Sequence, residues 1–234
     1  MIHAVLAVMA SLQLLDFFER YQGTPHQMAA IQQLQESIPA EVLADDAEWF
    51  AAWKASGRSE LLVVPYFNQR DNRSRQGFRE CFSSAMAMIA AYWGMVHTDD
   101  EYNRMRGWFG DTTSIAAQTN TLRHLGLDAS FVNFGSPKII EEEINMGRPV
   151  GVGLLFKGDL TKGEAPRGYG HWVVVIGYTK EFYFLHDPNG TPDFDRGLHV
   201  APTGGESVKV ARATLDNRWM VEGYGSGWMI TVGG

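Results

Sequence analysis

The chain has a single cysteine, Cys81, among its 234 residues. One cysteine cannot form an internal disulfide, and without a cluster of Cys and His residues it does not indicate a structural zinc site. Two interpretations remain for Cys81, a small buried hydrophobic residue or a reactive thiol. The residues around it must decide between them.

Positive charge and long hydrophobic runs are also scarce. The 20 Lys and Arg are outnumbered by 27 Asp and Glu, for a net charge of −7, and no basic cluster is present, so we expect no nucleic-acid partner. The apolar stretch within residues 1–22 is too short to cross a bilayer, and no Lys or Arg precedes it. We predict a buried helix there, no membrane span and synthesis in the cytoplasm; an uncleaved export signal is the alternative.

The pattern of the chain changes near residue 60. Residues 1–57 show helical periodicity and capping signals that predict three helices. From Leu61 the sequence LLVVPYF predicts a β-strand, followed by a polar loop that ends at Glu80. We therefore divide the chain into a helical N-terminal module, residues 1–58, and a larger domain, residues 59–234.

The larger domain is rich in helices first and in strands later. CFSSAMAMIAAYWG predicts a tightly packed helix from Cys81, and further helices are expected near residues 98, 114 and 136. PVGVGLLF, HWVVVIGYT and EFYFLHD predict strands, the last two paired antiparallel through a turn near Lys180, with short strands at 206–210 and 227–232. The expected fold is α+β, a helical half packed on an antiparallel sheet.

Cys81 is the first residue of its predicted helix. Its sulfur would therefore lie among unpaired backbone N–H groups at the positive end of the helix dipole, and both favour the thiolate that attacks a carbonyl. His171 opens an otherwise apolar strand after Gly-Tyr-Gly, which suits a general base better than a packing residue. Five other histidines have no supporting pattern; they are His3, His26, His97, His124 and His199.

Asp187 ends the strand that is predicted to pair with the strand of His171. The hairpin would fold it back beside His171, where a carboxylate fixes the tautomer of the imidazole and stabilises the imidazolium. A second interpretation is that Asp187 only starts the Asp-Pro-Asn-Gly turn. His186 is a rival base, but strand alternation points it to the other face.

Stabilisation of an oxyanion needs a donor besides the backbone N–H of Cys81. Gln69 is our candidate for this side-chain amide, because it lies upstream of the nucleophile at the start of the polar loop. Asn68 beside it is the main rival. We also predict that Asn68, Phe82 and Trp172, next to these residues in the chain, contact the substrate.

Four motifs occur in order: VPYFNQRDN, CFSSAMAMIAAYWG, GRPVGVG, and GHWVVVIGY with HDPNG. Over about residues 61–190 the chain thereby resembles the C39-like cysteine peptidase family. The resemblance implies a papain-like fold, with Cys81, His171 and Asp187 catalytic and Gln69 in the oxyanion hole. Phe82 stands where many family members have Gly or Asn after the cysteine, and the interval from Gln69 to Cys81 is longer than in the bacteriocin-processing branch. The chain is therefore more similar to stand-alone proteins of bacteria and phages.

These residues predict hydrolysis of a peptide or amide bond by a Cys-His-Asp triad, with no metal and no cofactor. The phage-type resemblance favours a peptide of peptidoglycan as the substrate, and with it an endolysin-like role at the cell wall or in a virion. The alternatives are an intracellular peptidase or amidase that acts on soluble peptides, and a catalytically silent module that binds peptides.

Overall fold

The computed structural model describes residues 61–234. The predicted N-terminal module and its three helices therefore lie outside the described residues, and the domain boundary stays a prediction. The helices are α4 (Cys81–Tyr92), α5 (Asp99–Arg106), α6 (Ile115–His124), α7 (Pro137–Asn145) and α8 (Arg212–Trp219), with short 3-10 helices η1 (Gln69–Asp71), η2 (Gly77–Arg79) and η3 (Leu160–Lys162). No helix among these residues is long and apolar enough to span a membrane.

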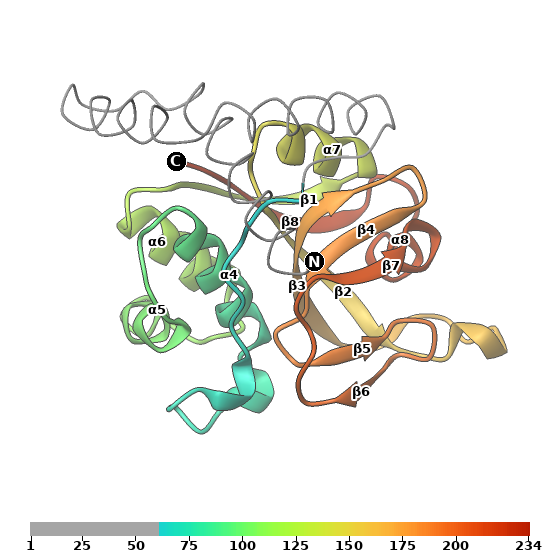
Figure 1. Ribbon diagram of the computed structural model, residues 1–234, viewed down its shortest axis with the longest axis horizontal. Helices are drawn as coiled ribbons and strands as arrows, with labels where there is room; N and C mark the ends of the chain where they lie inside the picture. The colour runs from blue at the N-terminus through green and yellow to red at the C-terminus, as the bar shows by residue number, and fades with distance from the viewer. Residues whose placement is uncertain (1–60) are drawn as a thin grey trace, which may run out of the picture. The chain divides into compact units, whose positions relative to one another are not determined.

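The strands form one antiparallel sheet and one small hairpin. The sheet has the order β1-β8-β2-β3-β4-β7, and β5 pairs with β6 apart from it. The strands are β1 (Asp128–Gly135), β2 (Val150–Lys157), β3 (Arg167–Tyr178), β4 (Phe182–His186), β5 (Thr191–Asp193), β6 (Leu198–Ala201), β7 (Val208–Ala211) and β8 (Gly227–Gly233). In Figure 1 the helices α4, α5 and α6 lie together on one side of the sheet, which confirms the predicted α+β architecture.

Helix α4 is buried along almost its whole length, from Phe82 to Ala90. Its small residues allow close packing, and its two hydroxyl groups are satisfied by neighbouring helices and loops. Ser83 Oγ lies 2.7 Å from Thr112 Oγ1, and Ser84 Oγ donates to Asp99 Oδ2 at 2.8 Å. Buried hydroxyls without such partners would destabilise the fold. The helix that begins at Cys81 is therefore held in place by its buried packing and by the hydrogen bonds of both serines.

Two glycines of β2 allow close packing, one against α4 and one against β3. A Cβ on Gly151 would lie 2.4 Å from Met86 Cε of α4, and one on Gly153 would lie 2.8 Å from Trp172 Cζ2 of β3. The motif GVG of β2 thus leaves the space that side chains from α4 and β3 occupy.

We expect Gly153→Ala to lower the free energy of unfolding by about 1–3 kcal/mol, because the new methyl group would collide with the indole ring of Trp172. Gly233→Ala in β8 is the matched control, since its Cβ would meet only an ordinary contact at 3.8 Å from Asp128 Cβ. Urea unfolding of both variants measures the difference. Equal stability of the two variants would contradict this account of β2.

The predicted strand over LLVVPYF is wrong. Residues 61–68 adopt no strand, although Leu62 N donates to Ile176 O of β3 at 2.8 Å. Pro65 lacks an N–H, so the segment cannot continue a ladder. Four elements were not predicted, namely β1, β5, β6 and α8. The others lie where the sequence indicated, namely α4, α5, α6, α7, β2, β3, β4, β7 and β8.

Candidate active site

Cys81 occupies the first position of α4 and is partly exposed. The first backbone N–H groups of a helix have no partner within the helix, so the thiol lies at an electropositive end. The thiol is also close enough to the His171 side chain to contribute, by hydrogen bonding and charge, to the raised pKa of His171. The structure therefore joins the lone cysteine to the histidine that the sequence singled out.

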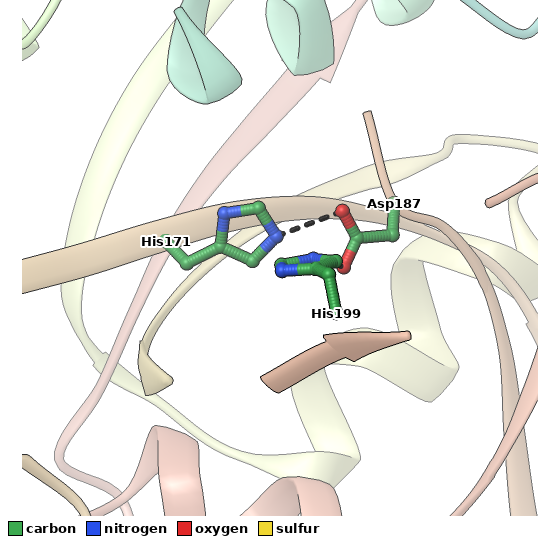
Figure 2. Close-up of side chains that lie close together, drawn as sticks. All are labelled: His171, Asp187 and His199. Carbon is green, nitrogen blue, oxygen red and sulfur yellow. Dashed lines mark hydrogen bonds and ion pairs between the residues drawn. The ribbon is translucent and has the colours of Figure 1, made fainter. Parts of the chain in front are cut away.

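His171 lies in β3, and Asp187 directly follows β4. The two strands pair as predicted, with Val174 opposite His186. His171 Nε2 lies 2.9 Å from Asp187 Oδ1, and both side chains are buried. Figure 2 shows this contact as the dashed line. Because Nε2 faces the carboxylate, Nδ1 is the ring nitrogen left for the thiol.

The charges of this pair stabilise each other. Burial disfavours a charged His171, but the negative charge and hydrogen bond of Asp187 outweigh burial and raise the pKa of His171, with Cys81 adding to the rise. Burial also opposes ionisation of Asp187, but the charge and hydrogen bond of His171 and the hydrogen bond of His199 hold the pKa of Asp187 below its usual range. Both pKa shifts favour the charged forms, an ionised Asp187 carboxylate beside a protonated His171 ring.

The backbone of Asp187 is held as firmly as its side chain. Tyr66 Oη donates to Asp187 O at 3.1 Å, and Asp187 N donates to Gly205 O at 2.7 Å. Burial, followed by the charge of Asp187, raises the pKa of Tyr66 to about 12, which keeps its hydroxyl a donor. Position 205 requires glycine, because a Cβ there would lie 2.0 Å from Asp187 O.

His199, which sequence analysis did not select, joins this group. It lies in β6, and its Nε2 is 3.0 Å from Asp187 Oδ2. Its contact depends on the β5–β6 hairpin, which was not predicted. The only local signal is the alternation of LHVA, which is too short to place a side chain.

His171, Asp187 and His199 could also hold a metal ion, because their ligand atoms all lie within 4.8 Å of one another. His₂-carboxylate sets bind zinc in several enzymes. Each of these ligand atoms also has a hydrogen-bond partner inside the cluster, at 2.9 Å and 3.0 Å. Hydrogen bonding alone therefore accounts for the arrangement.

Gln69 is buried in η1 and is hydrogen-bonded both to the residue after Asp187 and to η2, which precedes Cys81. Its backbone N donates to Pro188 O at 2.8 Å, and its Nε2 donates to Gly77 O of η2 at 2.5 Å. An amide nitrogen carries two hydrogens, and this bond uses one. Within residues 61–234 its buried Oε1 has no hydrogen-bond partner. An oxyanion role for Gln69 stays a prediction.

The three residues that we predicted to contact substrate all have structural partners. Phe82 and Trp172 are buried and stack face to face, with ring centroids 3.7 Å apart. Asn68 caps η1, with its Oδ1 accepting from Arg70 N at 3.0 Å, and its Nδ2 donates to Pro202 O at 2.8 Å. Their substrate contacts stay predictions.

His186, the rival base, is occupied elsewhere. Its Nε2 lies 2.9 Å from Val64 O, and its Nδ1 accepts from Ser207 N at 3.0 Å. Burial lowers the pKa of His186, which matches a neutral ring that links two backbone segments. Both ring nitrogens therefore serve the fold.

The sequence was compared with models of protein families and with curated proteins. The model of the Peptidase_C39 like family matches residues 61–196, more than half of the chain. No curated protein matches.

Three solved structures are similar to the chain. A protein of Bacillus anthracis described as a C39-like peptidase has a TM-score of 0.52 and 17% identity, over 76% of this chain and 98% of that one. The double glycine motif protease of an AMS/PCAT transporter, solved with a leader peptide, has a TM-score of 0.47 and 18% identity, over 75% and 93%. The peptidase domain of Streptococcus ComA, a bifunctional ABC transporter, has a TM-score of 0.46 and 12% identity, over 74% and 98%.

At these identities the first of the three structures supports the fold alone, and it agrees with the α+β arrangement of residues 61–234. The family is shown by the match over residues 61–196. The chain belongs to the Peptidase_C39 like family.

Proposed function

We propose that the chain is a cysteine peptidase in which Cys81 is the nucleophile, His171 the base and Asp187 the group that orients the base. One observation carries this proposal: the lone cysteine begins a buried helix and raises the pKa of a nearby histidine, His171, whose Nε2 lies 2.9 Å from the buried Asp187 carboxylate. A module that only binds peptides would not need a cysteine, a histidine and an aspartate placed next to one another in this way.

The reaction follows from the positions of these groups. The Cys81 thiolate attacks the amide carbonyl, and its S–C bond forms as the carbonyl electrons move to the oxygen. The backbone N–H of Cys81 and the second amide hydrogen of Gln69 would stabilise this oxyanion. When the intermediate collapses, the C–N bond breaks and His171 gives the proton it took from the thiol to the leaving amine from Nδ1, which leaves the acyl group on Cys81 as a thioester. Water then attacks the thioester while His171 takes its proton, and the C–S bond breaks to return the Cys81 thiol.

For the substrate we propose a peptide of peptidoglycan, either a stem or a cross-link. The proposal is supported by the resemblance of the four sequence motifs to stand-alone proteins of bacteria and phages. It implies that the protein, made in the cytoplasm, acts after release to the cell wall or from a virion. Hydrolysis of soluble peptides inside the cell is the competing proposal.

Two exposed aromatic rings are better placed than Phe82 and Trp172 to contact a substrate. Tyr169, 95% exposed, lies in β3 two residues before His171, where the pairing with β2 is irregular. Phe78, 81% exposed, lies in η2, three residues before Cys81. We propose that these rings pack against the substrate on the two sides of the reacting bond.

Tyr169→Ala is expected to raise KM about tenfold with little change in kcat, because a stacking contact removed from the bound substrate weakens binding in the ground and transition states alike. Tyr224→Ala is the matched control, since this tyrosine is also exposed but lies outside the strands and helices. Steady-state kinetics on a cleaved peptide give both constants. An unchanged KM for Tyr169→Ala would remove this ring from the substrate site.

The proposed function is tested by incubating the purified chain with peptidoglycan and, separately, with an unfolded soluble protein, followed by mass spectrometry of new amino ends. The control is the same chain treated with iodoacetamide, which has a single cysteine to modify. New ends only from untreated protein would establish a cysteine peptidase. Cleavage of the soluble protein alone would discard the peptidoglycan substrate, and equal cleavage by treated protein would refute the role of Cys81.

A further inference from the structure

Two histidines from different strands share one buried carboxylate. His171 of β3 contacts Asp187 Oδ1 at 2.9 Å, and His199 of β6 contacts Asp187 Oδ2 at 3.0 Å. Figure 2 shows both rings directed at this carboxylate. The reaction proposed above uses only His171, so the second histidine needs its own explanation.

The partners of His199 indicate which of its nitrogens carries the proton. Its Nδ1 lies 3.1 Å from Asn189 Nδ2, an amide nitrogen that can only donate. Nδ1 is then an acceptor, so the proton is on Nε2, which donates to Asp187 Oδ2. Asn189 also donates its backbone N–H to Asp187 Oδ1 at 2.8 Å. The carboxylate therefore accepts from both histidines and from Asn189.

These donors matter because Asp187 is completely buried, with an exposed fraction of 0%. A buried carboxylate without water stays ionised only if hydrogen bonds and charges replace its hydration. The bonds from His171 and Asn189 both end on Oδ1, whereas Oδ2 accepts from His199. His199 thus fixes the rotation of the carboxylate that presents Oδ1 to His171.

His199 is itself held by packing. Its ring stacks on Phe156 of β2, with centroids 4.3 Å apart and an interplanar angle of 24°. The fully buried Arg218 of α8 donates to Phe156 O at 2.6 Å and to Gly158 O at 2.7 Å, and it also donates to Phe194 O. Arg218 thereby links the end of β2 to the turn between β5 and β6.

We infer that His199 is a positioning residue of this site, which donates to Asp187 Oδ2 and so holds the carboxylate ionised and aligned with His171. The inference rests on the proposed cysteine mechanism and adds a fourth side chain to its Cys81, His171 and Asp187. It also gives the β5–β6 hairpin a role in the reaction, since this hairpin carries His199 to the carboxylate.

Two variants separate hydrogen bonding from packing. His199→Phe keeps a flat ring against Phe156 but removes the donor, whereas His199→Gln keeps an N–H near the position of Nε2 but removes the ring. The readout is the rate at which iodoacetamide alkylates Cys81 at pH 6, which requires no substrate. We expect a rate about tenfold lower for His199→Phe, and a rate within about threefold of wild type for His199→Gln.

The exposed His124, which contacts Trp108 and Phe109, supplies the matched control His124→Phe. This variant should alkylate at the wild-type rate. A wild-type rate for His199→Phe, or a loss in His199→Gln as large as in His199→Phe, would overturn the inference. In either case the hydrogen bond donated to Asp187 would not determine the alkylation rate.

The contact itself is tested without reference to reactivity by ¹⁵N NMR of the histidine rings. A proton on Nε2 of His199, in the neutral or the charged ring, supports donation to Asp187, and a proton on Nδ1 alone refutes it. Wild-type alkylation no faster than that of the unfolded chain would instead count against the cysteine mechanism, and the NMR result would still decide the His199 contact.

Discussion

Replacement of Cys81 by alanine is expected to abolish hydrolysis, with a loss of at least about 10⁴-fold in kcat/KM. The reason is that the thiol is the nucleophile of the proposed reaction and no second cysteine exists to replace it. The fold should survive, because Cys81 is only partly buried and alanine is favourable in a helix. Peptide cleavage measured beside urea unfolding separates the two effects.

Cys81→Ser is the matched control for this result. A serine keeps a hydroxyl that can hydrogen-bond with His171, but a hydroxyl is a weaker nucleophile than a thiolate. We expect the serine variant to retain the wild-type stability and still lose at least about 10³-fold in rate. Substantial cleavage by either variant would mean that another residue attacks the substrate.

Asp187→Asn is expected to lower kcat by about three to four orders of magnitude, because an amide cannot stabilise the imidazolium or fix its tautomer. It should also lower the free energy of unfolding by about 3 kcal/mol, since removal of one partner leaves the buried His171 without its opposite charge. Kinetics and thermal unfolding of the variant measure both quantities.

The stability loss in Asp187→Asn should depend on pH. The pKa of His171 is raised, so its contribution to stability is complete below the unfolded value of 6.5 and disappears as pH rises through the folded value. The pKa of Asp187 is lowered, so its contribution is complete above 3.8 and disappears as pH falls through the folded value. The difference in Tm from wild type should be largest between these two reference values.

The exposed Asp111 supplies the control Asp111→Asn. Its carboxylate accepts from Thr113 and pairs with Arg79 at the surface, where such contacts contribute well under about 1 kcal/mol. A stability loss in Asp187→Asn no larger than that in Asp111→Asn, or constant from pH 4 to pH 9, would contradict the buried ion pair.

Sequence reasoning located Cys81, His171 and Asp187 because each is marked by local chemistry. Cys81 begins a helix with a run of small and apolar residues. His171 lies in β3 and Asp187 directly follows β4, and a short turn joins these strands, so the proximity of the two residues follows from strand pairing. Both signals depend on residues close together in the chain. His171 and Asp187 are in contact, Cys81 contributes to the raised pKa of His171, and the catalytic roles of the three remain our proposal.

His199 was dismissed because its role depends on contacts that are distant in sequence. It reaches Asp187 through a hairpin of short strands, and it stacks on Phe156, which is 43 residues away. The misplaced strand at 61–67 has a different cause: the apolar run LLVVPYF matches a strand in composition, but its proline prevents continuous pairing. The proline was visible in the local pattern, whereas the distant contacts of His199 were not.

The central claim is that Cys81 is activated by the His171–Asp187 pair, and the most direct test is its alkylation by iodoacetamide at pH 6. The native chain and the chain unfolded in urea contain the same single cysteine. A free thiol is less than about 1% ionised at this pH, so we expect the native chain to react at least about tenfold faster and His171→Phe to remove the difference. A native rate equal to or below that of the unfolded chain would contradict the account.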